Sequence, residues 1–484
     1  MATLAEVGRS STTSREVARM LATAAATPAT AGPASESERP RRRGVPSDAE
    51  SRWSGTCDLG IHTPEEGRRP RRDRCVISRF IQPEAKRNGV SAINTDRTVC
   101  CGGMKRTIYG PDHDAFRESV REFVARSIAP RAEEFIENRM IDREVWLEAG
   151  RQGFLGLEVP EEYGGSAAGD YRFNAVLGEE LSGQSAALSS SLGIHYDVVA
   201  PYLVELTTEE QKKRWLPRFC SGEMITAIGM TEPSGGSDLA ALRTTAVRDG
   251  SDWIVNGSKT FITNGYCADL VVVAARTSPE KKAKGITLFA VETGMEGFTR
   301  GRKLDKVGQP EADTAELFFE NVRVPEENVI GEIDRGFIAM MERLPQERLG
   351  SAVANLAHAA AVLAETLVYV RERKAFGQAV GSFQHNKFVL ADLVTKIEVS
   401  QAFLDQCITA HTERELSAVD AAKAKMWTSE VQGEVLDACV QLYGGYGYMK
   451  EYRVARAWMD ARVTRIWAGS NEIMREIIGR DLGL

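Results

Sequence analysis

The sequence Ile225-Thr226-Ala227-Ile228-Gly229-Met230 marks the point at which the pattern of apolar residues changes from helical spacing to alternation. Alternation with a period of two is typical of a half-buried strand. Further strands are predicted downstream, over Leu270–Ala275, Ile286–Val291 and Ala315–Phe319. Asp249-Gly250 is expected to turn a hairpin within Thr244–Asn256, so this part of the chain forms a compact β domain.

Helical spacing of apolar residues precedes this stretch, from Met104 onward. Helices are predicted from Pro111 to just before Pro130 and over Arg143–Gln152, Phe173–Ser182 and Leu188–Leu206, the last with a kink at Pro201. Thr207 and Glu210 form a predicted capping box for a short helix that Pro217 ends.

Helical spacing returns after Gly336 and persists to the end of the chain. One predicted stripe consists of Leu349, Val353, Leu356, Ala360, Leu363, Leu367 and Val370, and later helices are predicted over Lys387–Glu413, Ser417–Tyr443 and Glu472–Arg480. The order predicts an α+β fold with an N-terminal helical domain (104–222), a middle β-sheet domain (223–333) and a C-terminal helical bundle (334–484).

Residues 1–103 differ from the remainder in composition. They are rich in Ala, Thr, Ser and Pro and carry basic clusters at 39–43 and 68–74, without a sustained apolar period. Such a segment buries too little surface to offset chain entropy, so we expect a disordered extension. Our hypothesis is that Met104 is the true start. A transit peptide, favoured by scattered arginines and opposed by glutamates, is the alternative.

The overall composition is that of a soluble globular protein: 484 residues, 43% apolar and 27% charged. A net charge of -7 gives no basic footprint for nucleic acid. No run of about 18 apolar residues predicts a membrane span. The eight cysteines contain no Cys-x-x-Cys pair, which favours a reducing compartment with Cys220, Cys267, Cys407 and Cys439 as buried thiols. No metal-ligand spacing is present.

Two segments of the β domain have the composition of ligand-binding loops. Met230-Thr231-Glu232-Pro233-Ser234-Gly235-Gly236-Ser237-Asp238 follows a strand, and its glycines and hydroxyls could meet ring atoms or phosphate oxygens. It lacks the G-x-G-x-x-G pattern of a Rossmann site. Phe261-Ile262-Thr263-Asn264-Gly265 offers an aromatic ring and a hydroxyl beside a turn. A plain loop or β-turn is the alternative in both cases. Asn256-Gly257-Ser258, a glycosylation pattern, is interpreted as a hairpin turn.

Two further segments end predicted helices with glycines. Arg371-Glu372-Arg373-Lys374-Ala375-Phe376-Gly377-Gln378 places cations at a helix C-terminus with Gly377 as its cap. Gln441-Leu442-Tyr443-Gly444-Gly445-Tyr446-Gly447-Tyr448 closes another helix, and its adjacent glycines could let a phosphate or dinucleotide lie against the backbone.

Two segments of the predicted C-terminal helical bundle carry acidic residues at helix starts. Leu344-Pro345-Gln346-Glu347-Arg348-Leu349 is predicted to open the long helix, with Glu347 in its first turn. Trp467-Ala468-Gly469-Ser470-Asn471-Glu472 forms a Gly-Ser turn before the last helix. A glutamate in a first turn is favoured by the helix dipole and is normally solvated, which is the alternative to a catalytic role.

Five motifs, in this order, resemble those of the acyl-CoA dehydrogenase family over Met104–Leu484: M-T-E-P-S-G-G-S-D, F-I-T-N-G, R-K-A-F-G-Q, Q-L-Y-G-G-Y-G and I-W-A-G-S-N-E-I-M-R. Members of that family bind FAD between the β domain and the C-terminal helices. They remove two hydrogens from the α and β carbons of an acyl-CoA thioester. The resemblance implies a homotetramer that shares its cofactor between subunits, with an electron-transferring flavoprotein as electron acceptor.

The resemblance also implies roles for individual residues. The loop would meet FAD through Met230, Thr231, Gly236 and Ser237, and the flavin edge would meet Phe261, Ile262 and Thr263. The pyrophosphate and adenosine would be held by Arg373, Phe376, Gln384, Gln441, Leu442, Tyr443, Gly444 and Gly445, with Ser470 and Glu472 closing the site. The acyl-CoA would contact Ser237, Arg348, Ala468 and Gly469.

One departure from the family pattern concerns the catalytic base. Many relatives carry a glutamate directly before the terminal Gly-Ser/Thr, where this chain has Ala468. The long-chain and isovaleryl branches place the base on the long helix before an arginine, which matches Glu347-Arg348. The resemblance therefore implies that Glu347 abstracts the α proton, with Glu472 as a weaker rival. Burial beside an apolar acyl chain would raise the pKa of this base.

The resemblance thus implies conversion of a long or medium-to-long acyl-CoA to its trans-2-enoyl-CoA, as in fatty acid β-oxidation, with the flavin accepting the β hydride. Expected locations are the cytoplasm of a bacterium or the mitochondrial matrix of a eukaryote. A flavin monooxygenase on the same fold, an isovaleryl or branched-chain dehydrogenase, and a flavin-binding scaffold that has lost its base are the alternatives.

Overall fold

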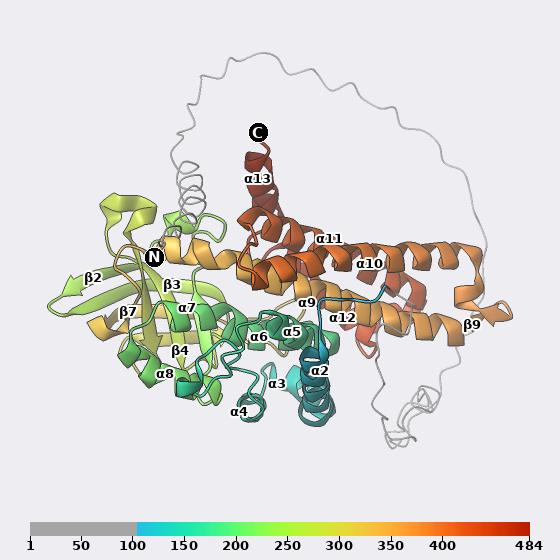
Figure 1. Cartoon of the computed structure of the whole chain (residues 1–484), viewed down its shortest axis with the longest axis horizontal. Helices are drawn as coiled ribbons and strands as arrows, with labels where there is room; N and C mark the ends of the chain where they lie inside the picture. The colour runs from blue at the N-terminus through green and yellow to red at the C-terminus, as the bar shows by residue number, and fades with distance from the viewer. Residues whose placement is uncertain (1–103) are drawn as a thin grey trace, which may run out of the picture. The chain divides into compact units, whose positions relative to one another are not determined.

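A computed structural model describes residues 104–484, and the predictions for residues 1–103 lie outside this range. The described chain runs through a helical part, a β-sheet part and a second helical part (Figure 1). The predicted α+β fold is therefore confirmed.

The N-terminal helices surround an aromatic core. They are α2 (Pro111–Phe123), α3 (Ala132–Asn138), α4 (Arg143–Arg151), α5 (Arg172–Gln184), α6 (Ala186–Gly193), α7 (Ala200–Glu205) and α8 (Glu209–Cys220). Phe123, Trp146 and Leu181 are fully buried between them. Burial of such large apolar side chains is the main stabilising contribution to this part of the fold.

The middle part is one sheet with helices against one of its faces. Its strands are β1 (Thr226–Gly229), β2 (Thr245–Asp249), β3 (Asp252–Thr263), β4 (Leu270–Arg276), β5 (Ile286–Glu292), β6 (Phe298–Lys303), β7 (Thr314–Val324) and β8 (Val329–Ile330). The strand order is β6-β7-β3-β2-β4-β5-β8, with β1 parallel to β4. Alternate residues of β4 face the helices on this side of the sheet: Leu270, Val272 and Ala274. They are completely buried against α7, α8 and the start of the helix that begins at Gly336.

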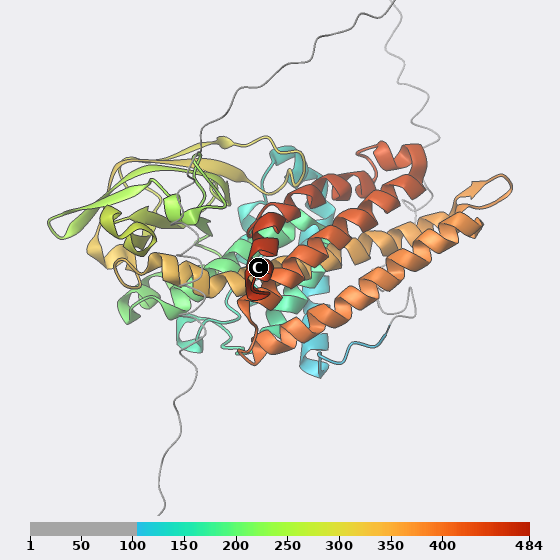
Figure 2. The same cartoon turned by 90° about the horizontal axis from the view of Figure 1, so that it is seen from above.

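The C-terminal part is a helical bundle whose long helices, α9 to α11, lie side by side in both views (Figures 1 and 2). It contains α9 (Gly336–Glu372), α10 (Gln384–Thr412), α11 (Ala418–Tyr443), α12 (Arg453–Ala461) and α13 (Asn471–Asp481). Two short strands, β9 (Lys374–Ala375) and β10 (Gln378–Ala379), form a hairpin between α9 and α10 that protrudes from the bundle (Figure 2). The predicted stripe of α9 is buried except at Ala360, which is partly exposed.

Helix α9 joins all three parts. Its first turns pack on the sheet through Phe337 and Met340, and its later turns pack on α5, α10 and α11. In the described part of the chain it is the one helix long and apolar enough to cross a membrane by length and composition. Its apolar face is covered by those neighbours, which is the environment of a core helix.

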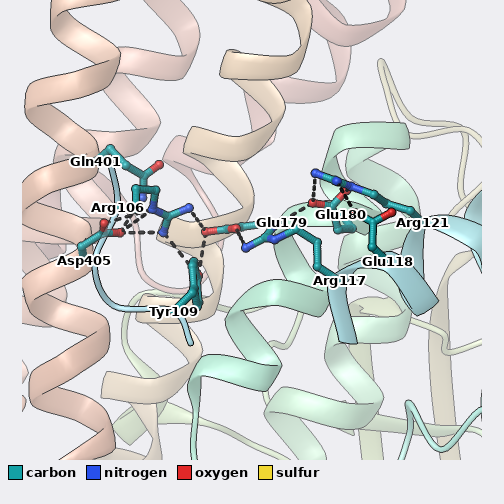
Figure 3. A network of polar contacts seen from close by, with 9 residues as sticks. All are labelled: Arg106, Tyr109, Arg117, Glu118, Arg121, Glu179, Glu180, Gln401 and Asp405. Carbon is teal, nitrogen blue, oxygen red and sulfur yellow. Dashed lines mark hydrogen bonds and ion pairs between the residues drawn. The ribbon is translucent and has the colours of Figure 1, made fainter. Parts of the chain in front are cut away.

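Buried ion pairs tie the segment before α2 to both helical parts (Figure 3). Glu179 of α5 lies between Arg106 and Arg117, at 2.7 Å and 2.9 Å. Arg106 also reaches Asp405 of α10 at 2.6 Å. The described chain is thus anchored at its N-terminal end, and α5 and α10 are held together through Arg106.

Three predicted helix boundaries were wrong. Helix α9 begins at Gly336 and contains Pro345, so Glu347 lies in its fourth turn and not in its first. The capping box of α8 consists of Thr208 and Gln211, which bond each other's backbone N–H groups at 3.3 Å and 2.8 Å. Pro217 lies inside α8, where packing outweighs the lost backbone hydrogen bond.

Several turns were also misplaced. The helix predicted over Leu188–Leu206 is interrupted by a π-helical turn at Ile194–Val199, and Pro201 falls at the start of α7. Asn256-Gly257-Ser258 lies within β3, with Gly257 at a bulge where a Cβ would meet Thr244 at 2.6 Å. Gly377 turns the β9–β10 hairpin and does not cap α9. The strands β6 and β8 and the helices α3 and α12 were not predicted.

Candidate active site

Glu347 lies within α9 and faces α7. The hydroxyl of Tyr202 donates a hydrogen bond to Glu347 Oε1 at 3.3 Å. Burial raises the pKa of Glu347 to about 7, while Arg348 and the Tyr202 hydroxyl act to lower it. The side chain is only partly exposed. A carboxylate that gains or loses its proton near neutral pH has the property required of a general base.

Arg348 points toward the turn that precedes α13. Its Nη2 lies 3.9 Å from the place that a Cβ on Gly469 would occupy, and its side chain is buried. Its Nε has no hydrogen-bond partner among the described residues. Burial lowers the pKa of Arg348 to about 10, although Glu347 acts to raise it. A buried guanidinium without a carboxylate bonded to it makes the local potential positive.

A second buried cation lies on the same turn. Lys425 of α11 donates hydrogen bonds to the carbonyl of Gly469 at 2.7 Å and to Asn471 Oδ1 at 3.1 Å. Burial lowers the pKa of Lys425 to about 8, and the neighbouring Arg348 acts in the same direction. The turn at Ala468-Gly469 therefore lies beside two cations, where negative charge on a bound group would be stabilised.

Ser470 and Glu472 have local roles at the start of α13. Ser470 Oγ accepts a hydrogen bond from the backbone N–H of Ile473 at 3.4 Å, as an N-cap residue does. Glu472 is exposed. Its own backbone N–H and the Ser470 hydroxyl lower its pKa. An exposed carboxylate with a lowered pKa is a poor base, so the geometry favours Glu347 over this rival.

A buried polar cluster supports the helix turn that carries Glu347. The side-chain amide nitrogen of Gln346 donates to Glu158 Oε1 at 3.1 Å and to the carbonyl of Asp197 at 3.0 Å. The side-chain amide of Asn174 donates to the side-chain carboxylates of Glu158 and Asp197. Burial and the nearby Asp197 charge raise the pKa of Glu158 to about 8. Burial raises the pKa of Asp197 to about 6. Four segments of the chain are joined here directly beside Glu347.

The loop Met230–Asp238 is fixed to β3 by a buried ion pair. Lys259 Nζ lies 2.8 Å from Glu232 Oε1 and also donates to the carbonyl of Met230 at 3.2 Å. Backbone N–H groups of Arg243 and Thr244 donate to the same Glu232 carboxylate. Thr231 is held as well, because its carbonyl accepts from Thr260 N at 3.0 Å. The loop beyond the pair, through Gly236 and Ser237, is exposed.

Phe261, Ile262 and Thr263 form the end of β3 next to this loop. The β3–β7 register shifts between Lys259 and Ile262, and Phe261 has a φ of 58°. Such a bulge re-aims a side chain. The ring of Phe261 is 69% exposed, whereas Ile262 is only 3% exposed. Of the three predicted residues, Ile262 can therefore offer a ligand little besides its backbone.

A hollow lies at the C-terminal end of α11. Its volume is about 430 Å³, and its walls include Arg373, Tyr369 and the segment Gln441–Tyr446. The sequence reasoning placed Arg373, Gln441, Leu442, Tyr443, Gly444 and Gly445 at one site, and all six line this hollow. Phe376 and Gln384 are exposed and lie nearby in sequence, at the hairpin and at the start of α10.

Most residues predicted to hold a dinucleotide therefore form two groups at opposite ends of α9 (Figure 1), while Ser470 and Glu472 lie at the start of α13. Met230 packs against the cluster that contains Phe337, near the start of α9, whereas Arg373 follows its last residue. A helix of 37 residues is about 55 Å long at a rise of about 1.5 Å per residue. A single chain does not bring the two groups together.

The sequence reasoning missed four residues around Glu347. Asp197 and Tyr202 are close in sequence, whereas Glu158 and Lys425 come from distant segments, and none of the four belongs to a recognisable motif. The position of Lys425 was a usable signal, because it lies among alanines and apolar residues of a predicted core helix. A lysine is seldom buried without a partner, so a polar partner for Lys425 could have been expected.

Comparisons with known proteins match the whole described chain. The acyl-CoA dehydrogenase N-terminal, middle and C-terminal domains match residues 110–223, 227–322 and 334–483. The long-chain specific acyl-CoA dehydrogenase, mitochondrial, of Rattus norvegicus is 47% identical over 381 residues, which cover 78% of this chain and 88% of the relative. The mitochondrial isovaleryl-CoA dehydrogenase of Solanum tuberosum is 38% identical, with 76% and 89% covered. The crystal structure of acyl-CoA dehydrogenase from Geobacillus kaustophilus superposes with a TM-score of 0.76 at 44% identity, covering 78% and 99%.

Proposed function

The chain belongs to the acyl-CoA dehydrogenase family, and from this premise we propose that Glu347 is the base that removes the α proton of the substrate. The protein is an oxidoreductase that dehydrogenates an acyl-CoA between its α and β carbons, as in fatty acid oxidation, and it resembles the long-chain enzyme at 47% identity.

The observation that carries the proposal is the environment of Glu347. The α carbon of a thioester is a very weak acid, so its base must be close, shielded from water and more basic than an ordinary carboxylate. Burial raises the pKa of Glu347 to about 7, and the exposed Glu472 has the opposite shift. The family places its base either directly before the terminal Gly-Ser/Thr or on the long helix. The first position is Ala468 in this chain, so only the second, Glu347, carries a carboxylate.

Arg348 and Lys425 support the same assignment. Loss of the α proton develops negative charge on the thioester oxygen, and that charge needs fixed donors or cations nearby. Both side chains lie at the Ala468-Gly469 turn, where they contribute positive potential without an acidic group bonded to Arg348. We assign this turn, with Ser237 of the β-domain loop, to contact with the acyl-CoA.

The residues present also fit FAD, the cofactor that the family uses. At Gly444 and Gly445 an added Cβ would meet no atom within 4 Å, so their backbone is open toward the hollow beside Arg373. The exposed ring of Phe261 and the open Gly236-Ser237 backbone are suited to an aromatic ring system. When bound, FAD supplies the acceptor for the hydride that leaves the β carbon.

We further propose that the protein is a homotetramer in which each FAD is shared between subunits. The separation of the two binding groups along α9 supports sharing, because the second group must then come from a neighbouring chain. Apolar side chains around the hairpin and α10 are also exposed, among them Phe376 at 97%, Val399 at 63% and Phe388 at 61%. An electron-transferring flavoprotein is the proposed acceptor. We assign the mitochondrial matrix in a eukaryote, by analogy with the mitochondrial relatives, and the cytoplasm in a bacterium.

The test is anaerobic reduction of the bound flavin by a panel of substrates. We expect palmitoyl-CoA to bleach the flavin absorbance faster than butyryl-CoA or isovaleryl-CoA. Fastest reduction by isovaleryl-CoA would replace the long-chain assignment with the branched-chain alternative. Absence of bleaching by every acyl-CoA, together with oxygen consumption by the reduced flavin, would favour the monooxygenase.

A further inference from the structure

A chain of contacts links Glu347 to three more residues and passes back and forth between α9 and α7. Tyr202 is fully buried, and its hydroxyl donates to Glu347 Oε1 at 3.3 Å. The guanidinium carbon of Arg343, one turn earlier on α9, lies 5.3 Å from the centroid of the Tyr202 ring. Arg343 Nη2 in turn pairs with Glu205 Oε2 of α7 at 2.6 Å. The contacts therefore hold the Tyr202 ring between the base and a paired arginine.

We propose that Tyr202 is a positioning residue of the reaction, whose hydroxyl orients the Glu347 carboxylate and stabilises its ionised form. The inference rests on the proposed role of Glu347 as the base. Tyr202 is the one hydrogen-bond donor to the Glu347 side chain within residues 104–484. A glutamate has three rotatable side-chain bonds, so a fixed donor removes freedom that would otherwise slow the approach of the carboxylate to the α carbon.

The phenol is suited to this role because it keeps its proton. Burial raises the pKa of Tyr202 well above its usual value, and the negative charge of Glu347 acts in the same direction. Tyr202 therefore donates, and Glu347 accepts, throughout the neutral range. Arg343 over the ring favours a stronger donor, since a cation near the ring draws negative charge away from the phenol oxygen.

Other charged groups that face Glu347 act without a hydrogen bond. Arg348 and Arg343 on α9 favour its ionised form, whereas Asp197 from the π-helical turn before α7 opposes it. Removal of the Tyr202 hydroxyl leaves all three in place. The effect of that hydroxyl can therefore be measured by itself.

The test compares Tyr202→Phe with Tyr196→Phe in the full-length holoenzyme. Tyr196 is buried in the same run of helix and forms no hydrogen bond with Glu347, so it is a matched control. For Tyr202→Phe we expect the acid limb of the pH profile of flavin reduction to move up by about one pH unit, which corresponds to about a tenfold lower rate below the limb. The infrared band of the Glu347 carboxyl, identified by its loss in Glu347→Gln, should titrate at the same higher pH in the oxidised enzyme without substrate. Tyr196→Phe should keep the wild-type unfolding temperature and the wild-type pH profile of flavin reduction.

The outcomes separate this inference from the proposed function. An unmoved limb and an unmoved carboxyl band in Tyr202→Phe, with Glu347→Gln inactive, would overturn the role of Tyr202 and leave Glu347 as the base. Wild-type flavin reduction by Glu347→Gln would overturn the role of Glu347, and the inference would fall with it. Equal shifts in Tyr202→Phe and Tyr196→Phe would mean that repacking of α7 and the turn before it moves the profile, which also contradicts a specific role for the Tyr202 hydroxyl.

Discussion

Removal of one partner of the Glu232–Lys259 pair should destabilise the protein at least as much as removal of both. The pair is the deepest in the β domain, with side chains that are 4% and 0% exposed and a separation of 2.8 Å. Loss of one partner of a buried pair costs about 3–5 kcal/mol because the other charge is left uncompensated. In Lys259→Met, Glu232 keeps two backbone N–H donors, so the expected cost is about 3 kcal/mol.

The reciprocal variant should cost a similar amount. In Glu232→Gln the Lys259 ammonium keeps only neutral acceptors, the carbonyl of Met230 and the amide oxygen of the new side chain. Burial already lowers the pKa of Lys259 to about 8 against the raising effect of Glu232, so the lysine should lose its proton at neutral pH, which limits the cost to about 3 kcal/mol. The double variant strands no charge and should cost no more than either single variant, so the coupling energy should be at least about 3 kcal/mol.

Urea unfolding of the four proteins at pH 7 measures these differences. The exposed pair Arg248–Glu326, at 3.0 Å and about half exposed, provides the control, and Glu326→Gln should change stability by less than about 1 kcal/mol. Additive effects of Lys259→Met and Glu232→Gln in the double variant would refute the reasoning. FAD content should fall with each single substitution, because the pair fixes the loop that carries Gly236 and Ser237.

Four further predictions concern charge and assembly. The rate of flavin reduction should rise with pH through about 7, because Glu347 acts only when ionised; a profile that is flat from pH 5 to 9 would contradict this. Protonated Glu347 is favoured in the folded state, so its stabilising contribution is present below about pH 4.5 and is lost as pH rises through about 7. Glu347→Gln should therefore raise the unfolding free energy above pH 7, by at most about 3 kcal/mol. Arg348→Met removes a buried unpaired cation, so it should stabilise the protein by about 1 kcal/mol and raise the thermal midpoint. It should also slow flavin reduction, because positive potential near the thioester oxygen is lost. A lower midpoint would count against the description of Arg348 as an unpaired cation. Phe376→Ser should shift the assembly toward smaller species in sedimentation velocity and lower FAD content, and an unchanged tetramer would remove the hairpin from the interface.

The domain order could be predicted from the sequence because each part has a strong apolar period of its own. The strands at Leu270–Arg276 and Ile286–Glu292 are buried and β-branched, and both were predicted to within a residue. The boundaries of α9 could not be predicted. Pro345 suggested a helix start, but the packing of Phe337 and Met340 on the sheet extends the helix past it.

The candidate site could be predicted only where its residues form contiguous motifs. The loop at Met230–Asp238 and the segment Gln441–Gly445 are such motifs, and the roles assigned to them stay predictions. Tyr202 and Lys425 reach Glu347 and Gly469 through tertiary packing, which leaves no local spacing to recognise. The alternative that Glu347 is a solvated glutamate in the first turn of a helix rested on a wrong helix start. Glu347 lies in the fourth turn of α9, faces α7 and is partly buried.

The most direct test of the central claim is rapid anaerobic mixing of palmitoyl-CoA with the wild-type enzyme, Glu347→Gln and Glu472→Gln, each loaded with FAD. If Glu347 removes the α proton, Glu347→Gln should bind FAD and acyl-CoA but reduce the flavin at least about a thousandfold more slowly, while Glu472→Gln should stay near the wild-type rate. Bleaching at the wild-type rate in Glu347→Gln, with loss of bleaching in Glu472→Gln, would contradict the claim and move the base to the start of α13.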